Sequence, residues 1–196
     1  PSGTDIKQMA YQKLGSNRLT VAVGNNSIIW TTDGTTWNNA NSYTNLPYVA
    51  VAPGNNFFVA IDQAGNVRKS GDGTNWSSAG TLPAGTYNSL EYGDGYHVAL
   101  ANSDSNAYVS TNNGDTWQTV SAGFSNVKFL AYGHGKWIAM TEAGDTWEST
   151  DNAQTWTQGP DLGNVQYDVA SLCFGNGRFV AAAYDSPNDI STVNNK

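Results

Sequence analysis

The sequence predicts an all-β chain that folds as a five-bladed β-propeller. Four tryptophans recur at steps of 39, 41 and 39 residues, and each of them ends a similar phrase rich in Thr, Asp, Asn and Gly. Five alanines inside apolar stretches recur at steps of 38 to 42 residues. A repeat of about 40 residues that contains several short strands is typical of propeller blades. The tryptophans are Trp37, Trp76, Trp117 and Trp156, and the alanines are Ala22, Ala60, Ala99, Ala139 and Ala181.

The third repeat shows how one unit divides into strands. An inner strand is predicted over residues 89–92, a second over 97–101, a third over 107–111 and an outer one over 117–120. The Gly93-Asp94-Gly95 segment predicts a tight turn after the inner strand, because glycine adopts positive φ without steric cost. No window of the chain shows sustained helical spacing of apolar residues, so strands and turns account for the whole pattern.

The repeats also predict the domain organisation. We expect a single propeller domain over residues 1–196, with blades at about 9–40, 48–80, 87–121, 127–159 and 169–196. The fifth blade is predicted to be incomplete, because the sequence ends before a fifth tryptophan and offers only residues 190–193 as a third strand. An uncovered strand edge favours pairing with another strand. We therefore expect residues 1–5 or a neighbouring subunit to cover this edge, with a three-stranded blade and a fragment of a longer chain as the alternatives.

The phrases that end in tryptophan carry a family resemblance. They read TTDGTTW (31–37), SGDGTNW (70–76), STNNGDTW (110–117) and STDNAQTW (149–156). They resemble the Asp-box (BNR) repeat of sialidase-like propellers, Ser/Thr-x-Asp-x-Gly-x-Thr-Trp, although the third has Asn in place of Asp, the fourth has Ala in place of Gly, and the first two are one residue shorter. The resemblance implies structural roles, in which the polar residue binds the backbone of its turn and the tryptophan packs between blades. The implied structural residues are Asp33, Trp37, Asp72, Trp76, Asn112, Trp117, Asp151 and Trp156.

Composition excludes several classes of partner. The net charge is −7 with nine Lys and Arg, so nucleic acid and anionic membranes are not expected partners. No run of 18 apolar residues is present, so no transmembrane helix is predicted. Cys173 is the only cysteine, which excludes an internal disulfide and a multi-cysteine metal site. Its apolar neighbours Leu172 and Phe174 predict that Cys173 is buried, and no cofactor or metal is expected.

The resemblance to sialidases raises an enzymatic hypothesis that the residues do not support. Such enzymes are expected to hold a substrate carboxylate with three converging arginines and to use a Tyr–Glu pair. Glu91 and Tyr92 are the best pair, but adjacent residues on a strand point to opposite faces. Two of the arginines occupy matching places after the first turn of their blades and the other lies on a third strand, so the three are not expected to converge. No catalytic residue is therefore predicted, and the chain is not expected to be an enzyme. The arginines are Arg18, Arg68 and Arg178.

The two histidines do not complete a catalytic or metal site. His97 occupies a strand position that Phe58, Trp137 and Phe179 fill in other repeats, which predicts packing between blades. His134 lies in a Gly-His-Gly turn, where it is expected to be solvated.

Loops at one rim of the propeller provide the candidate binding residues. The loops that join outer to inner strands and the turns between second and third strands are expected to share the rim opposite the tryptophan-containing turns. Aromatic rings with amide and carboxylate groups suit sugar recognition. For Tyr48 and Tyr87 the alternative is packing between blades. The candidates are Tyr43, Tyr48, Tyr87, Phe124, Tyr167, Asn102, Asp104, Glu142 and Asp185.

Three functions from different classes follow. The first is a non-enzymatic interaction or structural module, because low charge and abundant Asn, Thr and Gly resemble the composition of phage and viral surface proteins. Its expected partners are other protein subunits, in a homo-oligomer or a particle. The second is a lectin-like glycan binder, and the third is a sialidase-like glycosidase. No signal peptide is seen, and the expected location is extracellular or on a virion surface.

Overall fold

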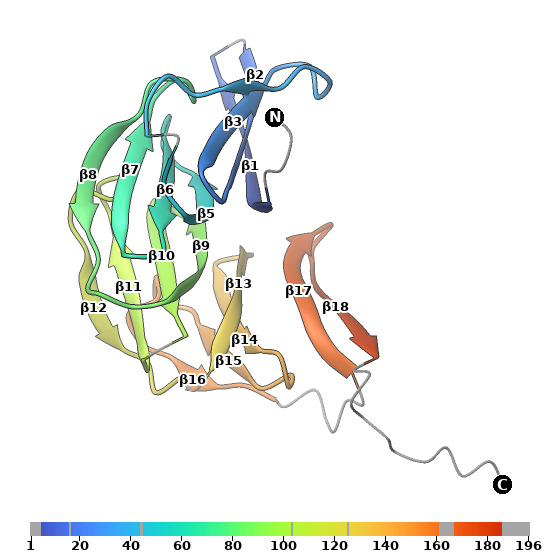
Figure 1. Cartoon of the computed structure of the whole chain (residues 1–196). Coiled ribbons are helices and arrows are strands. Elements are labelled where there is room, and N and C mark those ends of the chain that lie inside the picture. The colour runs from blue at the N-terminus through green and yellow to red at the C-terminus, as the bar shows by residue number, and fades with distance from the viewer. Residues whose placement is uncertain are drawn as a thin grey trace, which may run out of the picture.

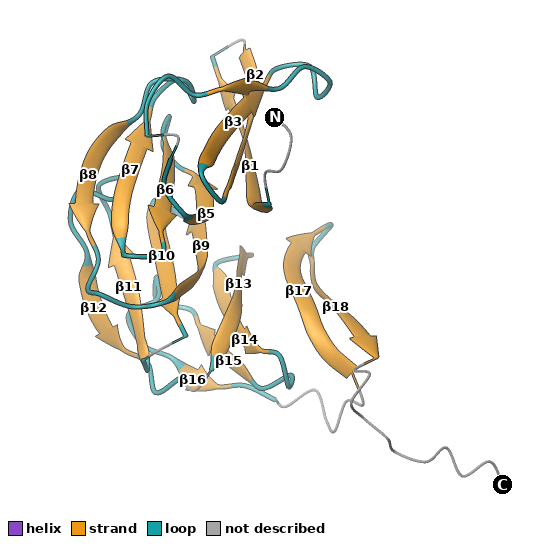
Figure 2. Ribbon diagram, viewed as in Figure 1, coloured by secondary structure: helices purple, strands orange, loops and turns teal. Residues whose placement is uncertain are grey.

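The structure is a computed structural model that describes residues 5–15, 17–43, 45–102, 104–124, 126–160 and 167–185. Within these ranges the chain forms strands and turns and no helix, as Figure 2 shows, and none of them holds a helix that could cross a membrane. The prediction of an all-β fold is confirmed.

Four antiparallel sheets of four strands follow one another along the chain, and a fifth sheet of two strands completes the described part. Each sheet is a meander, because consecutive strands pair through short turns. Blade 1 consists of β1 (Ile6–Leu14), β2 (Asn17–Gly24), β3 (Ser27–Thr31) and β4 (Asn38–Asn39). Blade 2 consists of β5 (Tyr48–Pro53), β6 (Phe58–Asp62), β7 (Asn66–Ser70) and β8 (Ser77–Thr81). Blade 3 consists of β9 (Tyr87–Gly93), β10 (Tyr96–Ala101), β11 (Asn106–Ser110) and β12 (Gln118–Ser121). Blade 4 consists of β13 (Val127–Gly133), β14 (Lys136–Thr141), β15 (Thr146–Ser149) and β16 (Thr157–Gln158), and the fifth sheet of β17 (Tyr167–Gly175) and β18 (Arg178–Asp185).

The sheets are arranged around one axis, as in a propeller. The first strand of each sheet is the innermost, and β1 packs on β5, β5 on β9, β9 on β13 and β13 on β17 (Figure 1). The ring is open between β17 and β1 (Figure 1). The prediction is thus confirmed for a propeller with four four-stranded blades, whereas the fifth blade is described as two strands. Its predicted third strand at 190–193 lies outside the described residues, as do residues 1–4.

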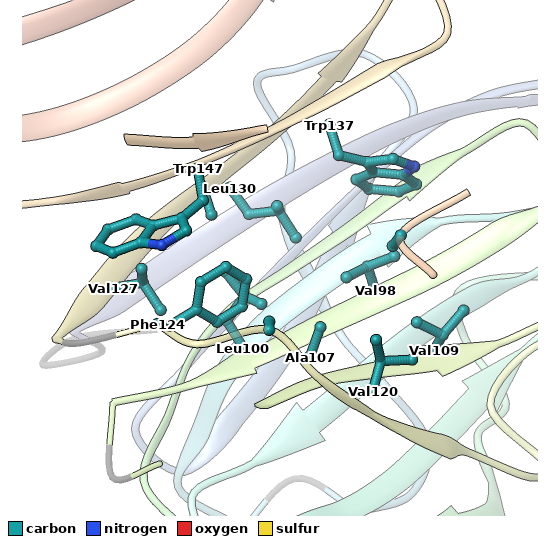
Figure 3. Close-up of a cluster of buried hydrophobic side chains, with 13 residues drawn as sticks. Val98, Leu100, Ala107, Val109, Val120, Phe124, Val127, Leu130, Trp137 and Trp147 are labelled. Carbon is teal, nitrogen blue, oxygen red and sulfur yellow. The ribbon is translucent and has the colours of Figure 1, made fainter. Parts of the chain in front are cut away.

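The hydrophobic core consists of three clusters, each between two successive blades. In the cluster between blades 3 and 4, Trp137 and Trp147 from blade 4 meet Val98 and Leu100 from blade 3 (Figure 3). The recurring alanines of blades 1 to 4 are at most 1% exposed, because a small side chain lets the sheets approach closely. They are Ala22, Ala60, Ala99 and Ala139. The described apolar core therefore lies between blades.

The tryptophan-containing turns are built by local hydrogen bonds. In blade 2, the Oδ1 atom of Asp72 accepts hydrogen bonds from the backbone N–H groups of Thr74 and Asn75 at 2.9 and 2.7 Å. The indole N–H of Trp76 donates to the carbonyl of Gly73 at 3.0 Å. The other three turns repeat the first of these patterns, so the polar residue stabilises the turn rather than a ligand. The corresponding side chains are Asp33, Asn112 and Asp151.

The prediction that Cys173 is buried is wrong, because its side chain is exposed. Its neighbours in the sequence are apolar, but burial of a propeller strand depends on a sheet that packs against it. Cys173 pairs with Val180, which is 52% exposed, on the face of the fifth sheet that points away from blade 4. No described blade covers that face, so the local sequence pattern gave the wrong prediction.

Candidate functional site

Every inner strand contains a β-bulge at the same place in its repeat. The register of the inner strand with the second strand skips one residue in each of the five sheets. A bulge leaves its extra residue unpaired and redirects the side chain, and bulges are common next to functional sites. The five bulged residues are Lys7, Val49, Asn88, Lys128 and Ala170.

The bulged residues together line a cavity of about 640 Å³ on the axis of the propeller. All five border this cavity and, with Phe129, also border a second cavity of about 550 Å³ beside it. We call the two together the central channel. Volumes of this size are those of ligand sites in proteins. The position that each blade uses to contribute to the channel is therefore the same, whereas the side chain differs.

The charged groups of the channel are already paired. The ammonium group of Lys7 contacts the carboxylate of Asp5, and that of Lys128 contacts Glu142. The amide of Asn88 donates to the carbonyl of Val127 at 3.3 Å. The walls therefore present local dipoles and apolar surface rather than one strong charge. Such a lining suits an occupant that is itself both polar and apolar.

Glu91 is the exception, because it lines the second cavity and forms no ion pair with a described residue. Its Oε1 atom accepts a hydrogen bond from its neighbour's backbone, the N–H of Tyr92, at 3.2 Å. Burial raises the pKa of Glu91 from 4.5 to about 7, although the backbone hydrogen bond opposes this shift. Ala10, Ala52 and Ala131 occupy the same place in other inner strands, so an acid here is particular to blade 3.

We expect Glu91→Gln to stabilise the protein at alkaline pH by about 1–3 kcal/mol. A folded-state pKa above the unfolded one means that the folded protein binds more protons between pH 4.5 and about 7, so Glu91 costs stability as pH rises through that window. Urea unfolding of both proteins at about pH 5 and pH 8 measures the difference.

His97 also contributes to the pH dependence of stability, with a sign opposite to that of Glu91, and comparing the variant with the wild type cancels this contribution. Burial lowers the pKa of His97 to about 4, so His97 costs stability as pH falls. This effect is present in both proteins and cancels. Glu148→Gln, which removes a carboxylate paired with Lys136, is the control and leaves the effect of Glu91 in place. Equal pH dependence in wild type and Glu91→Gln would contradict the prediction.

The predicted rim residues do lie at one end of the blades, but most of the aromatic ones are buried. Backbone bonds join the two loop sets there, for example from the N–H of Gln63 to Pro47 and from that of Asn102 to Thr86. Tyr48, Tyr87 and Phe124 are 0, 2 and 3% exposed. The prediction that these three rings are available at the rim is corrected, because each packs in a core cluster between blades.

The remaining rim residues do not converge. Tyr43 is 38% exposed and its ring lies 4.6 Å from the guanidinium of Arg68. Asp104 accepts hydrogen bonds from its own turn, namely from the hydroxyl of Tyr108 at 2.5 Å and the N–H of Asn106 at 2.9 Å. Asn102 and Glu142 border a smaller cavity of about 390 Å³, and Glu142 also borders the central channel. The side chains of Tyr167 and Asp185 lie outside the described part of the structure.

Residues considered for catalysis are separated. Tyr92 contacts the ring of His97 at 4.7 Å, toward blade 2, whereas Glu91 lines the channel. His97 is fully buried, with its Nε2 atom 3.0 Å from the carbonyl oxygen of Pro53, and His134 is exposed in a turn. Within the described ranges, no group of three or more His, Cys, Asp or Glu residues could hold a metal ion.

The sequence analysis missed the bulged residues, although a signal existed. In repeats two to five the bulged residue stands eleven positions before the recurring alanine. The residue two positions after each bulge is apolar, as at Leu90 and Leu130, whereas the bulged position varies from Ala to Lys. A variable position inside an otherwise regular strand indicates a side chain that does not pack in the core.

Comparison with known proteins supports the fold alone. No protein-family model matches the chain, and no curated protein matches its sequence. Solved structures do match. YCF48 bound to a D1 peptide has a TM-score of 0.70 and 16% identity, over 93% of this chain and 61% of that one. YCF48 from Cyanidioschyzon merolae has a TM-score of 0.63 and 17% identity, over 89% of this chain and 62% of that one.

An enzyme also has this fold. The GH74 enzyme of Niastella koreensis matches with a TM-score of 0.62 and 17% identity, over 86% of this chain and 26% of that one. This chain thus spans about three fifths of the length of the YCF48 structures and a quarter of that of the enzyme. The neighbours are β-propellers, as this chain is, and one fold carries unrelated functions.

Proposed function

We propose that this chain is a non-enzymatic interaction module whose central channel binds a segment of another protein. The observation that carries the proposal is the set of five bulged residues, one from each sheet, that all border the same cavity. Bulges at equivalent places are a costly irregularity unless the redirected side chains have a use. The neighbouring structure of YCF48 holds a peptide, which supports peptide binding by a propeller of this kind.

The lining supports a peptide rather than a sugar or a nucleotide. A peptide presents alternating backbone dipoles and side chains, and the channel offers amide, ammonium and carboxylate groups next to Val49 and Phe129. Three of the rings that were predicted to stack on a sugar at the rim, those of Tyr48, Tyr87 and Phe124, are buried. Glycan binding and hydrolysis therefore have less support.

Further parts of the proposal concern the architecture. The tryptophan-containing turns are Asp-box repeats, supported by the hydrogen bonds of Asp33, Asp72 and Asp151 to their own turns. The fifth sheet belongs to a fifth blade of one propeller domain that spans the chain, since its inner strand has the same bulge as the others. Composition supports a setting outside the cell or on a virion surface.

The channel is tested by blocking it. Short random peptides displayed on phage are selected on the immobilised 196-residue chain, and binding of synthetic copies is measured by calorimetry. We expect Ala170→Trp to weaken the binding of selected peptides at least about tenfold, because the indole fills the channel beside the bulge. Ala64→Trp, in the exposed β6–β7 turn, is the matched control and should bind as the wild type does.

Two outcomes would overturn the proposal. Either no peptide is enriched, or the enriched peptides bind the Ala170→Trp variant as well as the wild type. Binding of oligosaccharides from a glycan array, lost in the same variant, would assign the channel to the glycan-binding alternative.

A further inference from the structure

The contacts of blade 4 with blade 3 and with the fifth sheet share one pattern, whereas at the contact of blades 2 and 3 the equivalent glycine, Gly54, lies against His97. Each of the inner strands β9, β13 and β17 ends in an aromatic residue followed by glycine. The aromatic ring of one blade covers the glycine of the blade before it: a Cβ atom at Gly93 would lie 2.1 Å from the ring of Tyr132, and one at Gly133 would lie 2.2 Å from that of Phe174. The rings fill the space that the missing side chains leave.

Both halves of this contact are unfilled at the ends of the described ring. Gly175 ends β17, and among the described residues a Cβ atom there would have no heavy atom within 4 Å. Tyr11 on β1 stands at the place of Tyr132 and Phe174, two residues after the partner of the recurring alanine, and is 54% exposed. The fold thus presents a ring without a glycine at one end and a glycine without a ring at the other.

The residues around these two positions are apolar as well. The open face of blade 1 consists of Ile6, Met9 and Tyr11, of which the first two are 39 and 61% exposed. Their counterparts at the contact of blades 3 and 4, Val127 and Leu130, are 0 and 4% exposed. Surface positions that the repeat elsewhere buries between blades indicate a contact that another body completes.

The open face of the fifth sheet shows the same contrast. It consists of Cys173, Gly175 and Val180, and Val180 is 52% exposed. Val98, at the same place next to the recurring alanine of blade 3, is fully buried under Trp137 and its neighbours. The two open faces are therefore the two complementary sides of one inter-blade contact.

We infer that a second copy of this chain completes the contact, with the open face of blade 1 of one copy packed on the open face of the fifth sheet of the other and Tyr11 over Gly175. Within the described part of one chain the faces do not meet, because the ring is open between β1 and β17 (Figure 1). A second copy carries both open faces, and the residues on each face have the spacing that the repeat uses between successive blades. Such an interface is head-to-tail, since its two surfaces are different.

Two variants test the interface from opposite sides. Tyr11→Ser removes the ring, and Gly175→Val fills its place; neither changes a buried position, and thermal unfolding verifies that both fold. Sedimentation velocity over a micromolar concentration series measures association. We expect the wild type to associate, and we expect each variant alone to have a dissociation constant at least about tenfold higher than that of the wild type. Tyr43→Ser, an exposed tyrosine outside both faces, is the control and associates as the wild type does.

The decisive arm is the equimolar mixture of the two variants. Tyr11→Ser retains an intact fifth-sheet face and Gly175→Val an intact blade 1 face, so together they form one good interface and stop at a dimer. A wild type that stays monomeric throughout, or a mixture that stays monomeric, would overturn the inference. Ile6 and Met9 of the open face also border the second cavity, but Tyr11 and Gly175 border neither cavity of the channel. The interface variants therefore leave the peptide site in place, and each proposal can fail while the other stands.

Discussion

Gly93→Ala is expected to lower the free energy of unfolding by about 3 kcal/mol or more, because overpacking of a closed contact forces the backbone or a large ring to move. The added methyl group would lie 2.1 Å from two ring carbons of Tyr132. That ring cannot retreat freely, since the buried indole of Trp137 lies 4.7 Å behind it, centroid to centroid. Urea unfolding at neutral pH measures the loss.

Gly175→Ala is the matched control for this prediction. It makes the same chemical change at the same place in the repeat, but the added methyl group meets no heavy atom within 4 Å. At a protein concentration at which the chain is monomeric, we expect a change within about 0.5 kcal/mol, as for most surface substitutions. Similar losses in the two variants would show that the glycine is needed for its backbone and not for the ring that covers it.

Trp76→Ala is expected to cost about 3–5 kcal/mol, as large-to-small changes of aromatic core residues do. Trp76 is 5% exposed in the cluster between blades 1 and 2, and Gly73 of the same turn packs against Leu19 and Val21 of blade 1. Removal of the indole leaves a cavity between two blades and a carbonyl at Gly73 without its donor.

Trp37→Ala provides the comparison for Trp76→Ala. Trp37 has the same place in blade 1, where no described blade precedes it, and a Cβ atom on Gly34 of its turn would have nothing within 4 Å. We expect a loss of about 1–2 kcal/mol, because less surface is buried there. Thermal unfolding of both variants at one protein concentration measures the difference, and equal losses would contradict the assignment of these tryptophans to inter-blade packing.

The strands were predictable from the sequence because their signals are local. Turns that need positive φ mark the hairpins, as at Asp94 and Gly95, where φ is 50° and 87°. The predicted second strand at 97–101 agrees with β10 (Tyr96–Ala101) to one residue. A spacing of about 40 residues then leaves few architectures that pack such units side by side.

Burial was less predictable, because it depends on which sheet comes next. Tyr48 and Tyr87 follow loops, and nothing in their neighbours distinguishes a ring that packs inward from one that points to solvent. Cys173 shows the opposite error, since its apolar neighbours predict burial that only a following blade provides. Both are properties of inter-blade contacts, which the sequence of one blade does not contain.

The channel residues could not be predicted from alternation, because a bulge shifts the alternation by one residue. In a regular strand, alternation would assign Lys128 to one face of β13. The register change between Val127 and Phe129 makes Lys128 the extra residue of a bulge, so alternation does not apply to it. Strict alternation predicts that the inner strands belong to the core and that candidate ligand contacts lie in the loops. The structure makes the inner strands a second source of accessible side chains.

The bulges have a consequence for how such a protein changes over generations. The bulged positions, among them Asn88 and Ala170, are the part of each inner strand that its ladder leaves unpaired. Of the five, Val49 alone also packs against a described core cluster. Substitution there alters the wall of the channel with little cost to folding, one blade at a time. Five sites that vary independently on a constant frame allow a lineage to exchange one binding partner for another through single mutations, each of which leaves a folded protein.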